Sequence, residues 1–145
     1  MLTFVGFPSE PLQAPIYLTI GNFDGVHRGH QALIGDMAAA AHGAGAPCAP
    51  ALAGLLTFEP HPLAVLRPDV PALRLTSNEE RAGLLAALGL DFVLVLPFTP
   101  ATAATGAADF MAALTSHLHL KELWVGPDFT LGRGREGDPP RLAAL

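Results

Sequence analysis

The sequence is poor in residues on which several classes of protein depend. It holds one cysteine, Cys48, so no disulfide can form within the chain, and we expect that residue to be a small apolar filler. Lysine and arginine total 8 against 13 acidic residues, and the formal net charge is −5. Binding to nucleic acid requires clustered basic residues that neutralise phosphates, so this balance argues against a nucleic-acid partner.

Two further features are missing. The chain starts with neither a basic segment nor an apolar leader, and no apolar run reaches the roughly 18 residues that a membrane span needs. We therefore expect a cytoplasmic protein with no membrane partner, and the oligomeric state stays open. Half of the residues are hydrophobic, and 145 residues suffice for one domain with a single core.

Short apolar segments alternate with segments of helical character. The expected strands are residues 16–20, 51–58, 91–96 and 122–126. The expected helices are residues 31–42, 76–88 and 105–118, with another opening at Pro139. The proline-bearing residues 59–75 are expected to be mostly irregular loop. A Thr or Ser cap followed three residues later by Glu is typical of the helix start at residues 76–80, and Gly89 would end that helix.

This order of elements predicts the fold class. The strands are continuous apolar runs, so both faces of the sheet should be covered, and the intervening helices imply parallel pairs with right-handed crossovers. We expect an α/β protein with a doubly wound parallel sheet. Ligands of such sheets bind outside the carboxyl ends of the strands, where the polar motifs of this sequence fall.

One of these motifs lies between the first expected strand and its helix. His27 and His30 are three residues apart, so they share one face at the first helical turn, and Gly29 leaves room for a close ligand. A helix N-terminus offers unpaired N–H groups to phosphate, and imidazoles can donate to its oxygens. The alternatives are a metal pair or two surface histidines. The strand-to-helix context favours phosphate.

Residues 21–30 resemble the His-x-Gly-His loop of the nucleotidyltransferase superfamily, and residues 19–30 are similar to the FMN adenylyltransferase module of prokaryotic FAD synthetases. Three further segments resemble that family in order along the chain. They are Thr57 to Pro62, Arg74 to Thr76 with Glu79 and Glu80, and Val125 to Gly132 with Arg135 and Gly137. The resemblance implies a Rossmann-like nucleotidyltransferase fold and transfer of AMP from ATP to FMN in FAD biosynthesis.

The resemblance also implies roles for individual residues. His27 and His30 would be catalytic and would stabilise charge on the transferred phosphoryl group. The implied ATP-binding residues are Gly21, Asn22, Phe23, Asp24, Gly29 and Asp128. From the residues alone, Asp24 can equally bond backbone amides in its own turn. Phe23 is expected to pack in the core. For Phe129, packing and contact with a ligand are equally open.

Two more groups of residues concern the second substrate. The implied FMN-binding residues are Phe58, Glu59, Pro60, His61 and Pro62. The prolines would stiffen this loop beside a flat apolar slot, to which Leu63 can add, although His61 can equally be solvated. Arg133 and Arg135 are candidates for phosphate contact, whereas Arg141 reads as a solvated residue.

The implied reaction needs positioning and charge stabilisation more than a nucleophilic side chain. Mg²⁺ would accompany ATP, held largely by phosphates and water, so no dedicated metal site is expected. The family's Ser/Thr-rich segment ending in arginine would lie beyond Leu145. We therefore expect one FMN adenylyltransferase domain over residues 1–145, truncated at its C-terminus and without the riboflavin kinase domain. The alternatives are a non-catalytic nucleotide- or flavin-binding module, or another adenylyl or cytidylyl transferase of the same superfamily.

Overall fold

The computed structural model describes residues 1–47, 49–71, 73 and 75–145. The predictions made for Cys48 and Arg74 therefore lie outside the described residues. The strands are β1 Leu2–Val5, β2 Leu12–Ile20, β3 Leu52–Glu59, β4 Phe92–Pro97 and β5 Leu118–Trp124. The helices are α1 Arg28–Ala44, α2 Pro62–Leu66, α3 Asn78–Ala87, α4 Pro100–Ala103, α5 Ala107–His117, the 3₁₀ turn η1 Arg133–Arg135 and α6 Pro139–Ala144.

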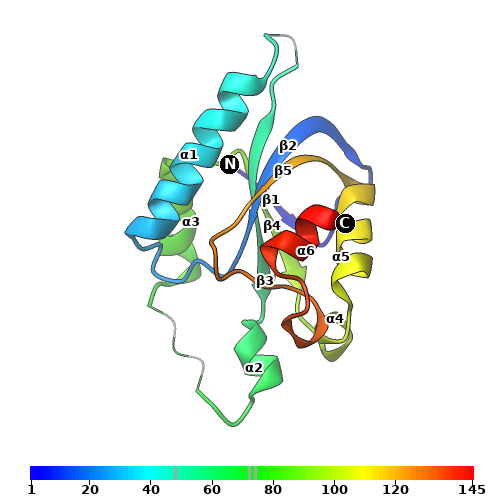
Figure 1. The fold of residues 1–145 in the computed structure, drawn as a ribbon. Helices are drawn as coiled ribbons and strands as arrows, with labels where there is room; N and C mark the ends of the chain where they lie inside the picture. The colour runs from blue at the N-terminus through cyan, green and yellow to red at the C-terminus, as the bar shows by residue number, and fades with distance from the viewer. Residues whose placement is uncertain (48, 72, 74) are drawn as a thin grey trace.

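The described strands form one sheet in the order β1-β4-β3-β2-β5, and every neighbouring pair is parallel. Helices α1 and α3 cover one face of this sheet, and α5 and α6 cover the other (Figure 1). The prediction of an α/β fold with a doubly wound parallel sheet is therefore confirmed. No described helix is both long and apolar enough to cross a bilayer.

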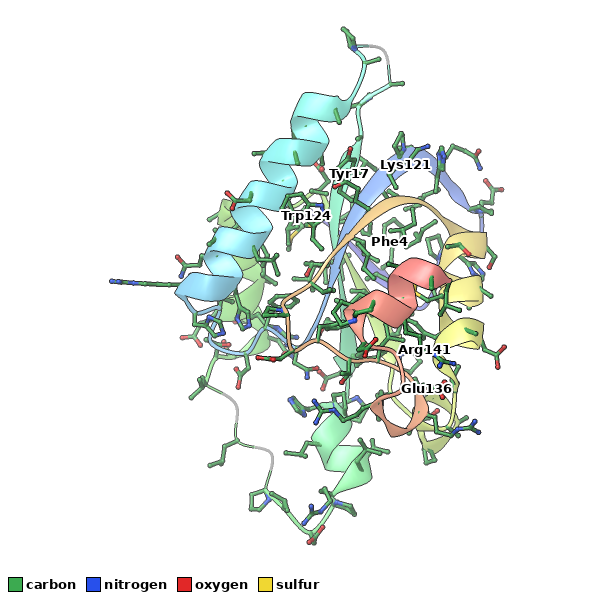
Figure 2. All side chains as sticks on the ribbon, viewed as in Figure 1. Phe4, Tyr17, Lys121, Trp124, Glu136 and Arg141 are labelled. Carbon is green, nitrogen blue, oxygen red and sulfur yellow. The ribbon has the colours of Figure 1, made fainter. Side chains whose placement is uncertain are left out.

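Alternation along the strands builds two apolar clusters, because successive side chains point to opposite faces. In β4, Phe92 and Leu94 pack on the α5 side, whereas Val93 packs on the α1 side. Figure 2 shows the same division for Tyr17 and Trp124, which lie toward α1, and for Phe4, which lies on the other face. A Cβ on Gly54 would lie 2.1 Å from the Phe92 ring, so the second cluster requires glycine at this strand position.

Several elements differ from the prediction. Strand β1 was not expected, because it is an edge strand of four residues with mostly exposed side chains. Strand β5 begins at Leu118, where a helix was predicted to end, and stops at Trp124 rather than at residue 126. The short helices α2 and α4 were also missed, although each has proline in its first turn, and α1 is longer at both ends than predicted.

The start of α3 follows the prediction closely. The Ser77 hydroxyl accepts the Glu80 N–H, and the Glu80 carboxylate accepts the Ser77 N–H, which together form a capping box. Gly89 follows the helix with a φ of +93°, as expected of a residue that ends one. Local sequence patterns therefore define this helix at both ends.

Candidate active site

The direction in which successive strands are added to the sheet reverses between the neighbouring strands β2 and β5. After β2 the chain continues through α1 to β3 on one side, and after β4 it returns through α5 to β5 on the other side. The carboxyl ends of β2 and β5 therefore open into the crevice where ligands of such sheets bind. Two segments line it: the histidine loop, residues 21–30, and residues 125–132.

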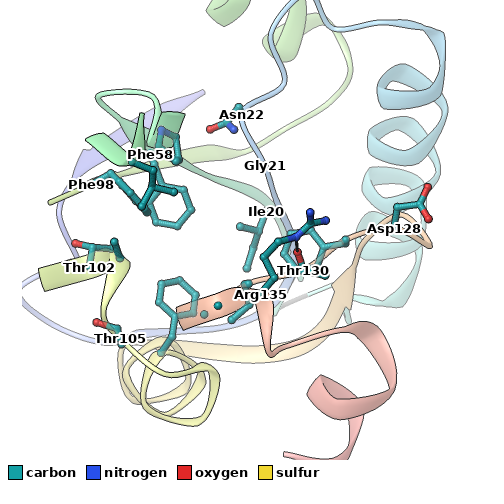
Figure 3. Close-up of a pocket in the computed structure, with 18 residues that line it drawn as sticks. Ile20, Gly21, Asn22, Phe58, Phe98, Thr102, Thr105, Asp128, Thr130 and Arg135 are labelled. Atoms are coloured by element: carbon teal, nitrogen blue, oxygen red, sulfur yellow. Dashed lines mark hydrogen bonds between the residues drawn. The ribbon is translucent and has the colours of Figure 1, made fainter. Parts of the chain in front are cut away.

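Two cavities occupy this crevice. The histidine cavity has a volume of about 730 Å³, and its walls include His27, Gly29 and His30. The phenylalanine cavity has a volume of about 630 Å³, and its walls include Phe58, Phe98 and Phe110 (Figure 3). The residues that line both cavities are Ile20, Gly21, Asn22, Asp128 and Phe129. The cavities are therefore adjacent and share a wall at the ends of β2 and β5.

His27 and His30 lie at the N-terminus of α1, as their spacing predicts. Their rings stack with centroids 3.4 Å apart, and the Nδ1 of His27 accepts the backbone N–H of His30 at 3.3 Å. His27 is thus the N-cap of α1, and this bond assigns the proton of its neutral ring to Nε2. Burial of the imidazole, and secondly the neighbouring His27, lower the pKa of His30 below its usual value of 6.5. At neutral pH, His30 is therefore uncharged.

The backbone of the histidine loop is unusual. Phe23 and Val26 have φ values of 49° and 41°, in the left-handed region that residues with a Cβ rarely adopt. Both side chains are buried under α1, and the Phe23 ring meets the His30 ring edge-on at 4.8 Å. The packing role expected for Phe23 is confirmed, and the same residue lines the histidine cavity.

The Asp24 carboxylate bonds to a distant part of the chain rather than to its own turn. It accepts the N–H groups of Leu75, at 2.8 and 3.0 Å, and of Thr76, at 3.1 Å. The Leu75 N–H is the first cause that holds the pKa of Asp24 below its usual range. The carboxylate is therefore charged at neutral pH and organises the loop, while its predicted contact with ATP stays a prediction.

Unpaired buried polar atoms are concentrated at one cavity. Among the described residues, four side-chain atoms are buried without a hydrogen-bond partner. Three of them, Thr19 Oγ1, Asn22 Oδ1 and His30 Nδ1, belong to residues that line the histidine cavity; the fourth is Thr57 Oγ1. Because an unpaired buried polar group costs free energy, this concentration is typical of a ligand site.

The phenylalanine cavity combines aromatic walls with one cation. The rings of Phe58 and Phe98 meet edge-on at 5.4 Å, and Figure 3 shows both facing the hollow. Opposite them, the Nε of Arg135 donates to the Thr130 hydroxyl at 3.0 Å. Within the described part of the chain, the Arg135 guanidinium has no carboxylate partner. The cavity can therefore accept a flat aromatic ligand that carries an anionic group.

The predicted FMN-binding residues divide into two sets. Phe58 and Pro62 line the phenylalanine cavity, whereas Glu59, Pro60 and His61 are not part of its wall. His61 instead caps α2, since its Nδ1 accepts the Leu63 N–H at 3.0 Å. Flavin contact by these three residues stays a prediction.

The loop that carries Arg135 is fixed to the start of α5. Leu131 and Gly137 close the loop as a bridge, and the Arg133 N–H donates to the Thr105 carbonyl at 2.8 Å. The Glu136 carboxylate accepts the Ala107 N–H at 2.7 Å, where the N-cap residue Gly106 offers no side chain. Both arginines are exposed, but Arg135 lines the phenylalanine cavity whereas Arg133 lines neither cavity. Of the two predicted phosphate contacts, only Arg135 therefore faces the crevice.

Asp128, implied by the resemblance to bind ATP, lies in the wall that the two cavities share, and its contact with ATP stays a prediction. Its side chain points away from the phenylalanines in Figure 3. In residues 1–47, 49–71, 73 and 75–145, no three His, Cys, Asp or Glu side chains gather as they would around a metal ion. Among the described residues that line the two cavities, Asp128 is the one carboxylate.

Sequence reasoning missed several wall residues. Thr19, Phe98, Phe110 and Thr130 were not predicted as site residues, although all four line a cavity. Thr19 had a usable signal, because a polar residue near the end of an apolar strand points to the carboxyl edge of the sheet. Phe98 and Phe110 had none, since apolar residues beside strands and on helices are ordinary core residues.

Comparison with known proteins identifies related chains. The family model described as FAD synthetase matches residues 9–145. The bifunctional riboflavin kinase/FMN adenylyltransferase of Escherichia coli strain K12 is 41% identical over 131 residues, which cover 90% of this chain and 40% of that protein. The FAD synthetase of Listeria monocytogenes is 30% identical over 139 residues, which cover 95% of this chain and 54% of that protein. The chain thus spans about half or less of the length of these relatives.

A solved structure has the same fold. A crystal structure described as a macrolide-efflux protein from Streptococcus pneumoniae superposes with a TM-score of 0.79. The match covers 99% of this chain and 47% of that chain at 23% identity. At this identity the likeness concerns the fold alone.

Proposed function

The chain belongs to the FAD synthetase family, and we propose that it transfers AMP from ATP to FMN. A phosphate oxygen of FMN forms a bond to the α-phosphorus of ATP. The bond from that phosphorus to the oxygen bridging toward the β-phosphorus breaks, and pyrophosphate leaves with this oxygen. The products are FAD and pyrophosphate, and no covalent enzyme intermediate is needed.

The observation that carries this proposal is the pair of adjacent cavities. One has a helix N-terminus and two imidazoles, which suit a triphosphate. The other has aromatic walls and an arginine, which suit a flavin with a phosphate. Asn22 and Asp128 lie in the wall that the cavities share, so the two phosphates would meet there. Holding reactants in line is the main requirement of such a transfer.

His27 and His30 would stabilise the charge that develops on the transferred group. The capping bond of His27 leaves its Nε2–H available to a phosphate oxygen. His30 is uncharged at neutral pH, so it would act as a hydrogen-bond donor and not as a fixed cation. The N-terminus of α1 adds its positive dipole end. Donors placed in this way cost no reorganisation when the reaction occurs.

Arg135 would recognise the phosphate of FMN. Its guanidinium lines the phenylalanine cavity, and its described partner there is a neutral hydroxyl, so its charge is available to an anion. Riboflavin, which lacks the phosphate, should then bind more weakly than FMN.

We also propose that Mg²⁺ accompanies ATP. The single carboxylate of Asp128 at the shared wall fits an ion that keeps most of its ligands from phosphates and water. When bound, the ion would neutralise part of the phosphate charge. Because the proposed substrates are ATP and FMN, we further propose that the reaction takes place in the cytoplasm. The net charge of −5 argues against a nucleic-acid partner.

Calorimetry tests the assignment of the two cavities. FMN should bind to chain already saturated with α,β-methylene-ATP, because the substrates occupy separate cavities. Arg135→Ala should remove the preference for FMN over riboflavin, whereas Arg133→Ala, two residues away and outside both cavities, should retain it. Displacement of the ATP analogue by FMN, or equal effects of the two arginine variants, would contradict the assignment.

A further inference from the structure

The histidine loop is held from outside by the segment that opens α3. The Thr76 hydroxyl donates to the Asp24 carboxylate at 3.1 Å, and its oxygen accepts the Gly25 N–H at 3.3 Å. The Arg81 Nη1 donates to the Asn22 carbonyl at 2.9 Å. Together with the bonds from the Leu75 and Thr76 N–H groups, these contacts join segments more than 50 residues apart. They form one fastening between α3 and the loop, which we call the α3 latch.

The loop needs such a fastening because its backbone conformation is costly. Residues other than glycine with positive φ persist only where the surrounding structure determines their position, and the loop has two of them, Phe23 and Val26. From α1, the Gln31 side chain donates to the Val26 carbonyl at 2.9 Å. The α3 latch holds the loop residues before Val26. The position of His27, one residue after Val26, therefore depends on both the latch and the bond from Gln31.

The latch also reaches the shared wall of the two cavities. Arg81 bonds the backbone of Asn22, whose own side chain ends in the buried, unpaired Oδ1. The charge of Arg81 adds to the bonds that hold the pKa of Asp24 low, so the carboxylate stays ionised and its bonds are charge-assisted. A shift of the latch would displace a wall residue and the histidines together.

We propose that Thr76 and Arg81 are positioning residues for nucleotide binding and transfer. Neither residue lines the histidine cavity or the phenylalanine cavity. Thr76 acts through Asp24 and Gly25, and Arg81 acts through Asn22, so that His27 and His30 are held where the phosphates bind. The inference rests on the proposed function for what the loop binds, but the contacts themselves do not depend on it.

The test compares variants of neighbouring residues in the full chain. Thr76→Val removes both hydroxyl contacts at nearly constant volume, and Thr76→Ser restores them. Arg81→Ala removes the bond to Asn22. Ser77→Ala is the matched control, because it weakens the cap of α3 while leaving the latch groups in place. ATP–Mg affinity is measured by calorimetry, and the ring signals of His27 and His30 by NMR.

Thr76→Val and Arg81→Ala should each weaken ATP–Mg binding about 10-fold or more, since the loss of a hydrogen bond to a charged group has an effect of at least this size. Both should shift the histidine ring signals, whereas Thr76→Ser and Ser77→Ala should remain close to wild type. Unchanged affinity and signals in a folded Thr76→Val variant would overturn the proposal, and so would an equal effect of Ser77→Ala. If wild type binds no ATP but the signals shift as expected, the latch stands and the proposed function fails.

Discussion

Glu136 allows the phenylalanine cavity, which is the proposed FMN site, to be perturbed separately from the histidine cavity. Its carboxylate caps α5 by accepting the Ala107 N–H at 2.7 Å, and it follows directly after Arg135 in the loop (Figure 2). Glu136→Ala removes this cap. Loss of a helix cap costs about 1 kcal/mol, and loss of a hydrogen bond to a charged group about 1.5–3 kcal/mol. Because Glu136 is only half-buried, we expect a loss of about 1–2 kcal/mol in the free energy of unfolding.

For a chain of this size, that loss corresponds to a fall in Tm of about 3–8 °C. The loop that carries Arg135 would also be released at one of its anchors, so FMN affinity should fall while ATP–Mg affinity stays unchanged. Glu136→Gln keeps a neutral acceptor and should lose less than half as much stability. Scanning calorimetry and titration with each substrate measure these quantities.

Asp109→Asn is the matched control for Glu136. Asp109 lies in the first turn of the same helix, so its replacement removes a favourable charge without removing the bond to Ala107. This variant should lose about 0.3–1 kcal/mol of the free energy of unfolding and keep the FMN affinity of wild type. A Tm of Glu136→Ala equal to that of wild type, or an equal loss of ATP and FMN affinity in this variant, would refute the proposed role of Glu136.

Three further predictions concern single residues. His30→Ala should lower the rate of FAD formation about 10²–10³-fold in a folded protein, as for other lost charge-stabilising donors, and a steady-state assay with a melting curve checks this. Gly132→Ala should lower the free energy of unfolding by about 2 kcal/mol or more, because the added Cβ would lie 2.7 Å from the Ala107 nitrogen at a φ of +85°. Gly35→Ala, in open space on α1, should instead raise Tm slightly, and thermal melts of the two variants check this. Lowering the pH below about 6.5 should destabilise wild type more than His30→Gln, because the unfolded chain takes up the His30 proton before the folded chain does; Tm measured against pH tests this.

The sequence predicted those features that depend on neighbours in the chain. Ser77 and Glu80 are three residues apart and form their capping box, and His27 and His30 share the first turn of α1 for the same reason. The order of apolar segments was enough for the parallel sheet. The resemblance to FAD synthetases rested on motifs of this local kind, and the family match over residues 9–145 agrees with it.

Features that depend on distant partners could not be predicted. Strand β1 is stabilised by β4, about 90 residues away, and its own residues give a weak signal. The partners of Asp24 lie 51 and 52 residues further on, so the sequence left open which amides it bonds. Phe98 and Phe110 reach one cavity only after α4 and α5 have packed at the end of the sheet.

The most direct test of the central claim is to incubate the purified chain with FMN and ATP–Mg and to measure both products. FAD and pyrophosphate should form in equal amounts, with little product from riboflavin or from the His30→Ala variant. Binding of both substrates without any FAD would contradict adenylyl transfer and would favour a module that only holds a nucleotide and a flavin.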